Sequence, residues 1–205
     1  MKTQRGSYPL LYPIPICLLG AQVDGKPNYE AIGNIGMVSF NPNLMMISSI
    51  RDHHTNRGVN EHGTFSINYP KVEMLTETDY CGMVTGKTED KGRLFKTFYG
   101  VLETAPTIDE CPVNLECRVL DTLQYGSNEV WIGEVVETYI DEGIAPKEPK
   151  KWPTINQVNP IVYSPPGTYW DLGKQIGKGY EAGKNIKKLT DSLHNDGTSL
   201  SPHFK

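Results

Sequence analysis

Short apolar runs separated by turn residues recur along the whole chain. They are too short for typical helices, and Gly, Pro, Asn or Asp residues bound them, which is the pattern of β-strands. The turn at residues 24–27 (Asp-Gly-Lys-Pro) predicts a hairpin between residues 18–23 and 28–34, and Gly126 in the turn 124–128 predicts another. We expect strands at residues 12–20, 28–34, 44–50, 64–68, 114–120, 130–139 and 159–163.

Two other segments favour short helices. Residues 51–62 precede Gly63, a residue type that often ends helices, and residues 71–79 carry apolar side chains at helical spacing. Residues 81–91 and 141–153 are rich in glycine, proline or charge, so we expect loops there.

These elements predict a mainly β protein. The chain has 205 residues with 20 glycines and 15 prolines, which suits many short strands better than long helices. With six to eight strands and few short helices, the expected architecture is an antiparallel barrel, because closure removes exposed edges. One domain is expected over residues 1–182, followed by a polar C-terminal tail at residues 183–205.

Charge and composition exclude several classes of function. The formal net charge is −4, so we expect no general nucleic-acid binding. The longest apolar stretch, residues 14–19, is too short for a membrane span, and no secretory signal is expected at the N-terminus. Four scattered cysteines favour reduced, mostly structural thiols and a cytoplasmic location. No shared metal site is expected from the adjacent histidines, which would point to different faces of a helix.

Residues 47–55 concentrate groups that suit a phosphate. Ser48, Ser49 and Thr55 supply hydroxyls, and Arg51 supplies a bidentate guanidinium. A helix that starts near His53 would add backbone N–H donors. The alternative is an ordinary helix cap with solvated basic residues, and spacing alone leaves both interpretations open.

Residues 81–91 form the second candidate segment. Glycines there allow close backbone approach, and Lys87 or Lys91 could reach an anion, although such lysines are often only solvated. The Gly-Lys-Thr at 86–88 lacks the upstream glycine of a P-loop, so we expect no nucleotide triphosphatase. Cys81 is either a thiol near the active face or a packed thiol.

A set of short motifs in order makes the chain similar to a known family. The motifs lie at residues 12–21, 25–28, 31–36, 41–42, 49–51, 55, 65–68, 79–82, 86, 90–91, 115–117 and 132–135. No single motif is decisive, and the match depends on their order and spacing. With these motifs the chain resembles the flavoredoxin-type members of the flavin reductase-like, FMN-binding split-barrel family over about residues 8–175.

The resemblance implies a Greek-key split β-barrel and a homodimer that holds FMN at the subunit interface. It implies that residues 48–55 and Lys91 hold the phosphate, that residues 34–37 run along the isoalloxazine ring, and that Tyr163 covers part of the ring. Relatives often carry a bulky aromatic near position 34, where this chain has Gly33-Asn34-Ile35. The expected cofactor-binding residues are Asn34, Ile35, Gly36, Met37, Ser48, Ser49, Ile50, Arg51, His54, Thr55, Cys81, Lys91 and Tyr163.

The implied function is an FMN-dependent oxidoreductase. It would carry electrons from NAD(P)H or a redox protein to a flavin, iron or another acceptor, and no catalytic residue is assigned because the flavin performs the chemistry. The chain lacks a Gly-x-Gly-x-x-Gly fingerprint after a strand, which keeps open an FMN electron carrier without nicotinamide turnover. A third hypothesis is a flavin-free dimeric binding module.

Overall fold

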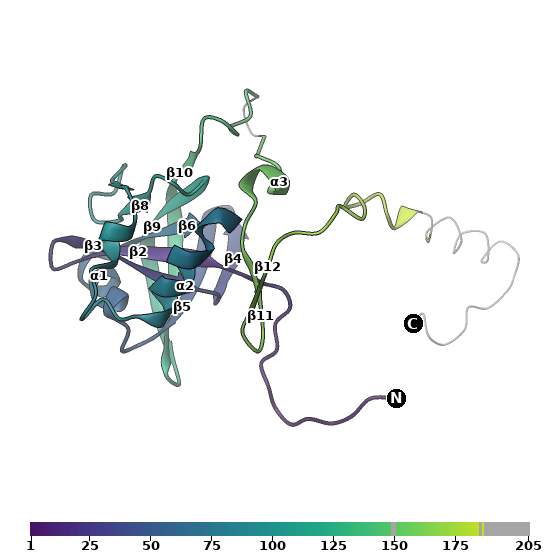
Figure 1. Cartoon of the computed structure of the whole chain (residues 1–205), viewed down its shortest axis with the longest axis horizontal. Helices are drawn as coiled ribbons and strands as arrows, with labels where there is room; N and C mark the ends of the chain where they lie inside the picture. The colour runs from purple at the N-terminus through teal and green to yellow at the C-terminus, as the bar shows by residue number, and fades with distance from the viewer. Residues whose placement is uncertain (149–150, 185, 187–205) are drawn as a thin grey trace, which may run out of the picture. The chain divides into compact units, whose positions relative to one another are not determined.

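A seven-stranded antiparallel sheet forms the frame of the protein (Figure 1). The computed structural model describes residues 1–148, 151–184 and 186. Neighbouring strands in this sheet are paired throughout in antiparallel register. Their spatial order is β3 (Lys26–Ile32), β2 (Cys17–Val23), β6 (Thr64–Tyr69), β9 (Val113–Tyr125), β10 (Asn128–Ile140), β5 (Asn43–Ile50) and β4 (Ile35–Phe40).

The sheet rolls around one core. Side chains from strands at both ends of the strand order meet in a single buried cluster, which Leu19 on β2, Ile47 on β5 and Trp131 on β10 share. A hydrogen bond from Ser49 Oγ on β5 to Glu30 Oε1 on β3 spans the two ends at 3.0 Å. The roll therefore places β3 beside β5, although four strands separate them in the order of the sheet.

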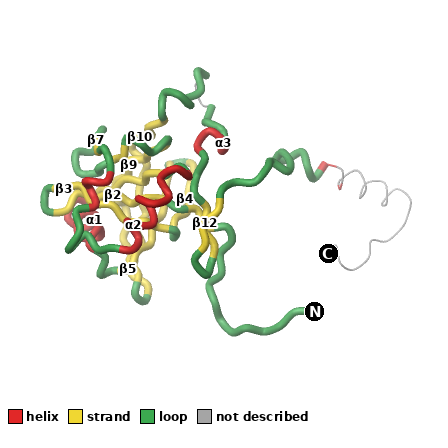
Figure 2. The backbone as a smooth tube through the Cα atoms, in the orientation of Figure 1, coloured by secondary structure: helices red, strands yellow, loops and turns green. Residues whose placement is uncertain are grey.

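Strand β2 is buried on both faces, which explains its continuous apolar sequence. Cys17 and Leu19 point into the rolled core, whereas Leu18 joins a second cluster with Tyr29 and Phe95. Helices cover this part of the sheet (Figure 2). The helical segments are α1 (His54–His62), η1 (Val72–Met74), α2 (Leu75–Met83), η2 (Lys91–Leu94) and α3 (Ile155–Val158).

Five shorter strands complete the part of the chain that the structure describes. Three of them form a small antiparallel sheet beside the main one, and two form a hairpin. The small sheet contains β1 (Ile14–Pro15), β11 (Val162–Ser164) and β12 (Thr168–Trp170), and the hairpin pairs β7 (Thr97–Phe98) with β8 (Thr107–Ile108).

The structure confirms the mainly β, antiparallel fold class and the two predicted hairpins. It also confirms that a short helix ends at Gly63, which adopts the left-handed conformation with φ of 63°. Three local predictions were wrong. Residues 12–20 form two strands rather than one, because β1 leaves the main sheet to pair with β11. The second helix continues to Met83, so Cys81 is helical, and the late strand starts at Val162 rather than at residue 159.

The chain divides into two units, Met1–Leu172 and Gly173–Lys205. The predicted boundary after residue 182 stays a prediction, and most of the predicted tail at 183–205 lies outside the described residues. In the part of the chain with a described structure, no helix has both the length and the apolar character needed to span a bilayer.

Candidate functional site

Two adjoining cavities lie where β3, β5, α1 and α2 approach each other. The helix cavity, of about 200 Å³, is lined by the start of α1, the end of α2 and Lys91. The strand cavity, of about 420 Å³, is lined by β3, β5, Tyr163 and Tyr169. Glu30 and His53 line both cavities, so the two form one elongated groove.

Lys91 brings a buried positive charge to the helix cavity. The residue is only 3% exposed, and its Nζ donates to two backbone carbonyls, Cys81 O at 3.2 Å and Val84 O at 3.3 Å. It forms no ion pair with a carboxylate within the described part of the chain. Burial lowers the pKa of the Lys91 ammonium, because desolvation penalises its charge. Such a cation on a cavity wall is well placed to receive an anion.

The N-terminus of α1 faces the same cavity. No side chain caps this helix. The Asn56 N–H donates to His53 O at 3.3 Å, whereas the N–H groups of His54 and Thr55 precede the first turn of helical hydrogen bonds. The Thr55 side chain is 1% exposed, and its Oγ1 accepts a hydrogen bond of 2.7 Å from Asn28 Nδ2 on β3. This bond fixes the start of α1 against β3. The helix dipole and the Lys91 charge thus act on one small volume.

A carboxylate and an imidazole meet at the junction of the two cavities. Glu30 Oε1 accepts hydrogen bonds from Ser49 Oγ and from His53 Nδ1, and the hydrogen bond to Glu30 raises the pKa of His53. The other oxygen, Glu30 Oε2, is buried without a hydrogen-bond partner. At the junction, Glu30 Oε2 could therefore accept a hydrogen bond from a bound molecule.

Glu116 shows what a purely structural buried carboxylate looks like in this protein. It is fully buried on β9, and both of its oxygens accept hydrogen bonds, from the backbone N–H groups of Gly100, Val101 and Leu102 and from the Tyr139 hydroxyl. Burying a polar atom without a partner costs free energy, and the fold avoids that cost at Glu116. Glu30 differs, because its Oε2 is buried on the wall of the groove without a hydrogen-bond partner.

Aromatic residues form one wall of the strand cavity. The rings of Tyr163 on β11 and Tyr169 on β12 pack edge to face with centroids 5.3 Å apart. The Tyr169 hydroxyl donates to Asp79 Oδ1 at 2.7 Å, which ties the small sheet to α2. Burial and this carboxylate both raise the pKa of Tyr169, so its hydroxyl stays protonated and keeps the wall in place.

Nine of the predicted residues line the groove. Four of them line the helix cavity: Cys81 and three residues that the family resemblance assigned to the phosphate. The other five line the strand cavity. Cys81 is 1% exposed, and burial raises the pKa of its thiol to about 11, so the thiol is protonated at neutral pH. The nine are His54, Thr55, Cys81 and Lys91 in the helix cavity and Asn34, Ser48, Ser49, Ile50 and Tyr163 in the strand cavity.

Four predicted residues line neither cavity of the single chain. Arg51 is tied to the β9–β10 turn, where its Nη2 donates to Gly126 O at 2.6 Å. Ile35, Gly36 and Met37 lie on β4, the edge strand of the sheet, and Met37 is 59% exposed. Their assignment to the cofactor stays a prediction.

The sequence analysis missed the junction of the groove. Glu30 looked like an ordinary residue of a predicted strand, and His53 was considered as a helix start and, with His54, as a metal ligand that was not expected. A charged residue within a short strand was the available signal, since such residues are seldom buried without a role. The hydrogen bond between Asp79 on α2 and Tyr169 on β12 was not predicted either, because it joins segments 90 residues apart.

Comparisons with known proteins agree with this geometry. The model of the flavin reductase like domain matches residues 10–170. The chain belongs to the flavin reductase-like family. It is 38% identical to a flavoredoxin from Methanosarcina acetivorans, whose structure superposes with a TM-score of 0.84 over 91% of this chain and 98% of that chain.

Two more distant proteins are also similar to this chain, one in sequence and one in fold. The FMN reductase (NADH) RutF of Agrobacterium fabrum is 28% identical over 61% of this chain and 75% of its own. A protein with a split barrel domain from Shewanella frigidimarina has a TM-score of 0.73 at 18% identity, over 82% of this chain and 87% of that chain. The rolled sheet is thus the split barrel that this family uses.

Proposed function

We propose that this flavin reductase-like protein binds FMN along the groove, with the phosphate in the helix cavity and the isoalloxazine ring in the strand cavity. The observation that carries the proposal is Lys91, a buried ammonium without a carboxylate partner in the described part of the chain, on the wall of a cavity that also receives the N-terminus of α1. A phosphate is the anion that this combination suits best.

The residues of the groove suit each part of FMN. Thr55 and Lys91 would hold the phosphate together with the first N–H groups of α1. The unpartnered Glu30 Oε2 would accept a hydrogen bond from a hydroxyl of the polyol chain, which must pass the junction. Tyr163 would cover part of the ring, and Asn34 and Ser48 would face its polar edge.

The proposed activity is electron transfer through the bound flavin. FMN supplies hydride and single-electron chemistry, so the protein need only bind it, orient it and control access to it. We propose a reduced nicotinamide or a redox protein as the donor and a flavin, iron or another oxidant as the acceptor. The FMN reductase (NADH) among its relatives supports a reduced nicotinamide as the donor.

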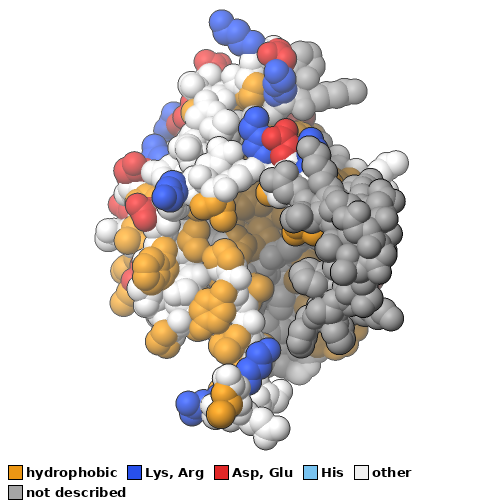
Figure 3. All heavy atoms as spheres, turned by 90° about the vertical axis from the view of Figure 1, so that its right-hand side faces the viewer, with side chains coloured by type: hydrophobic (Ala, Val, Ile, Leu, Met, Phe, Trp, Pro, Cys, Tyr) orange, Lys and Arg blue, Asp and Glu red, His pale blue; other side chains and the backbone are white. Residues whose placement is uncertain are grey.

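We further propose a homodimer. Apolar side chains gather on the face shown in Figure 3. On the edge strand β4, Met37, Val38 and Phe40 are 59%, 49% and 77% exposed, and Tyr125 at the end of β9 is 70% exposed. An edge strand with exposed apolar side chains is a natural interface. The predicted residues on β4 line neither cavity of their own chain. A second copy on this face would bring them close to the groove of its partner.

An absorption spectrum and a flavin titration test the binding proposal. We expect a yellow protein or, after the flavin is removed, quenching of FMN fluorescence at one site per chain. Thr55→Ala and Lys91→Ala should each weaken FMN binding by about 1–3 kcal/mol, because each removes one phosphate contact in a desolvated site. A colourless protein that takes up no FMN, or unchanged affinity in both variants, would contradict the assignment.

Anaerobic mixing tests the activity. If the protein is a reductase, NADH or NADPH should bleach the flavin absorbance within the time of a turnover. Reduction by dithionite but by neither nicotinamide would favour the electron carrier instead.

A further inference from the structure

The junction of the groove carries a histidine whose two ring nitrogens have different surroundings. His53 Nδ1 is hydrogen-bonded to Glu30 Oε1 and lies 3.3 Å from Ser49 Oγ. No hydrogen bond joins Nε2 to another group in the part of the chain that the structure describes. Because the carboxylate accepts from Nδ1, that nitrogen keeps its proton in both charge states of the ring. Nε2 is therefore the atom that gains or loses a proton.

Glu30 favours the charged form of this ring. Its side chain is only 7% exposed, and its Oε1 accepts hydrogen bonds from Ser49 Oγ and from His53 Nδ1. An imidazolium compensates the charge of a buried carboxylate, so the hydrogen bond to Glu30 raises the pKa of His53. The pair is thus neutral as a whole when His53 is protonated and negative when His53 is not.

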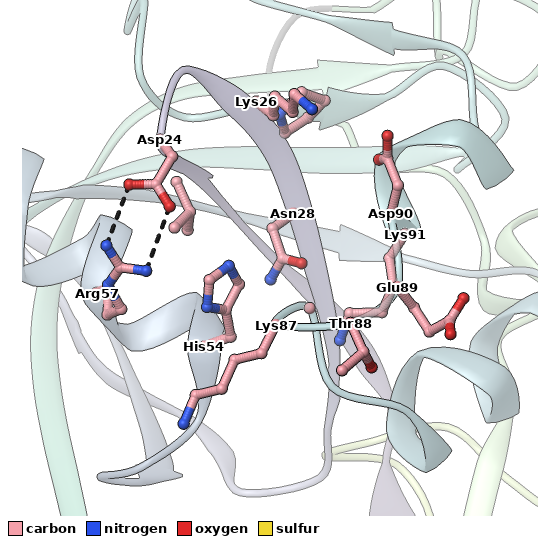
Figure 4. A pocket seen from close by; sticks show the side chains of 13 residues that line it. Asp24, Lys26, Asn28, His54, Arg57, Lys87, Thr88, Glu89, Asp90 and Lys91 are labelled. Carbon is pink, nitrogen blue, oxygen red and sulfur yellow. Dashed lines mark hydrogen bonds and ion pairs between the residues drawn. The ribbon is translucent and has the colours of Figure 1, made fainter.

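The next residue in the chain, His54, has the opposite environment. Its ring lines a further cavity beyond the phosphate end of the groove, together with Arg57 and Lys87 (Figure 4). No carboxylate is bonded to it, and its Nδ1 is buried without a hydrogen-bond partner. Burial and the positive charge of Arg57 lower the pKa of His54. Of these two adjacent histidines, His53 is the one whose surroundings favour a positive charge.

Other titratable groups of the groove also act on His53. Asp52 favours its charged form, and Lys91 disfavours it. A phosphate in the helix cavity would offset the charge of Lys91. Asp79 accepts the hydrogen bond from the Tyr169 hydroxyl, and the Cys81 thiol is protonated at neutral pH. Besides the two tyrosines, the titratable residues that line the groove with His53 are Glu30, Asp52, His54, Asp79, Cys81 and Lys91.

The covalent structure of FMN makes the position of this pair important. The polyol chain joins the phosphate to the ring, so the ring atoms nearest to the chain also lie nearest to the junction in the proposed placement. These atoms include N1 and the C2 carbonyl, where the negative charge of a reduced flavin gathers. His53 lines both cavities and so lies where chain and ring would meet. A negative charge there would strengthen proton binding at His53.

We propose that reduction of the bound flavin draws one proton from water onto His53 Nε2, so that the Glu30–His53 pair couples electron uptake to proton uptake. The inference rests on the proposed FMN site. Two electrons that arrive from the donor as a hydride leave the ring with one additional negative charge, and the proton on Nε2 compensates that charge. When the acceptor removes the two electrons, the proton returns to water.

Potentiometric titrations of the FMN-loaded protein between pH 6 and pH 10 test the inference. The comparison is His53→Asn, which keeps a donor for Glu30 but takes up no proton. We expect about tenfold tighter proton binding at His53 in the reduced protein. The potential of the wild type, relative to that of His53→Asn, should then be about 30 mV higher at pH 6 than at pH 10. For a two-electron couple, a tenfold change corresponds to about 30 mV.

Two further variants separate charge coupling from a structural role. Glu30→Gln keeps an acceptor for His53 but removes the carboxylate charge, so the pH range of the extra change in potential should move to lower pH. His62→Gln removes a histidine at the other end of α1 that lines neither cavity of the groove, and its potential should follow the wild type at every pH. A merely structural role of His53 would change affinity or stability without a pH-dependent change in potential.

NMR titration of the His53 ring in the oxidised and the reduced FMN-loaded wild type measures the same coupling without a variant. Equal pKa values of His53 in the two states would overturn the inference while the FMN site stands. So would a potential difference between the wild type and His53→Asn that stays constant from pH 6 to pH 10. If the wild type binds no FMN, the proposed function itself fails, and the inference fails with it.

Discussion

At the scale of single residues, buried charges separate structural from ligand-binding roles in this protein. Glu116 has hydrogen-bond partners for both oxygens, so its burial is explained by the fold alone. Lys91 has only backbone carbonyls as partners, and Glu30 keeps one oxygen unpartnered. Both incompletely partnered charges line the groove. A search for such residues identifies the site without reference to any relative.

Lys91→Met should weaken FMN binding with little effect on the stability of the fold. Removing the ammonium relieves its desolvation cost but leaves Cys81 O and Val84 O without their donor, so the free energy of unfolding should change by less than about 1 kcal/mol. FMN affinity should fall at least about tenfold, because a phosphate contact is lost. Urea unfolding and FMN titration measure the two effects, with the exposed Lys96→Met as the matched control. A loss of stability as large as the loss of binding would contradict this account.

The Glu30–His53 pair predicts a pH-dependent contribution to stability. The pKa of His53 is raised in the folded state by its hydrogen bond to Glu30, so the pair contributes fully below the ordinary histidine pKa of about 6.5 and less as the pH rises through the native value. The His53 side chain is 43% exposed, so we expect at most about 1 kcal/mol.

Urea unfolding of the wild type and of His53→Asn between pH 6 and pH 9 measures this contribution. The wild type should be the more stable at pH 6, and the difference in unfolding free energy should shrink toward pH 9. A constant or growing difference would argue against the ion pair.

At the scale of secondary-structure elements, the loop after α2 completes the site. Residues 84–91 follow the end of α2, and Val84, Thr85, Gly86 and Lys91 among them line the helix cavity. The loop holds its place because Gly86 lets it pack on Asn28 and His54. The position of Lys91 thus depends on a glycine five residues earlier in the chain.

Gly86→Ala should therefore weaken flavin binding without unfolding the protein. The new methyl group would overlap the Asn28 amide, so the loop must move away from β3 and carry Lys91 with it. We expect FMN affinity to fall about tenfold or more, while far-ultraviolet circular dichroism stays native. Gly173→Ala is the control, since nothing lies within 4 Å of a Cβ at that position. Native affinity in Gly86→Ala would show that the loop adapts without cost.

Sequence patterns predicted the elements better than the contacts between them. The hairpins and the end of α1 were predictable, because turn residues and the left-handed Gly63 determine them locally. Thr55 and Lys91 were predicted from residue type and family resemblance. The role of Glu30 could not be predicted, because it depends on the roll of the sheet that places β3 beside β5. No local sequence pattern indicates that contact. The break between β1 and β2 likewise depends on the pairing of β1 with β11, far along the chain.

At the scale of the whole molecule, the rolled sheet leaves one edge strand unprotected. β4 ends the strand order and carries exposed apolar side chains, including Phe40 at 77% exposure. A protein chain of this size seldom leaves such an edge uncovered. The proposed dimer would cover it and would bring residues of β4 from one protomer toward the groove of its partner.

Phe40→Glu should weaken the proposed dimer. A charge placed in a buried apolar interface would raise the dimer dissociation constant about tenfold or more, and analytical ultracentrifugation over a range of concentrations measures it. Trp152→Glu is the comparison, because Trp152 is similarly exposed but lies in a loop rather than on the edge strand. If Phe40→Glu sediments like the wild type, β4 does not form the interface.

The burial of all four cysteines has a practical consequence. Cys17, Cys81, Cys111 and Cys117 are each at most 2% exposed, and burial raises the pKa of every one of these thiols. Because the reactive form is the thiolate, maleimide reagents at neutral pH should label the folded protein slowly. A new cysteine at the exposed Ser127 in the β9–β10 turn would then be the fast-reacting thiol, so a fluorophore or spin probe could be attached there with all native cysteines left in place.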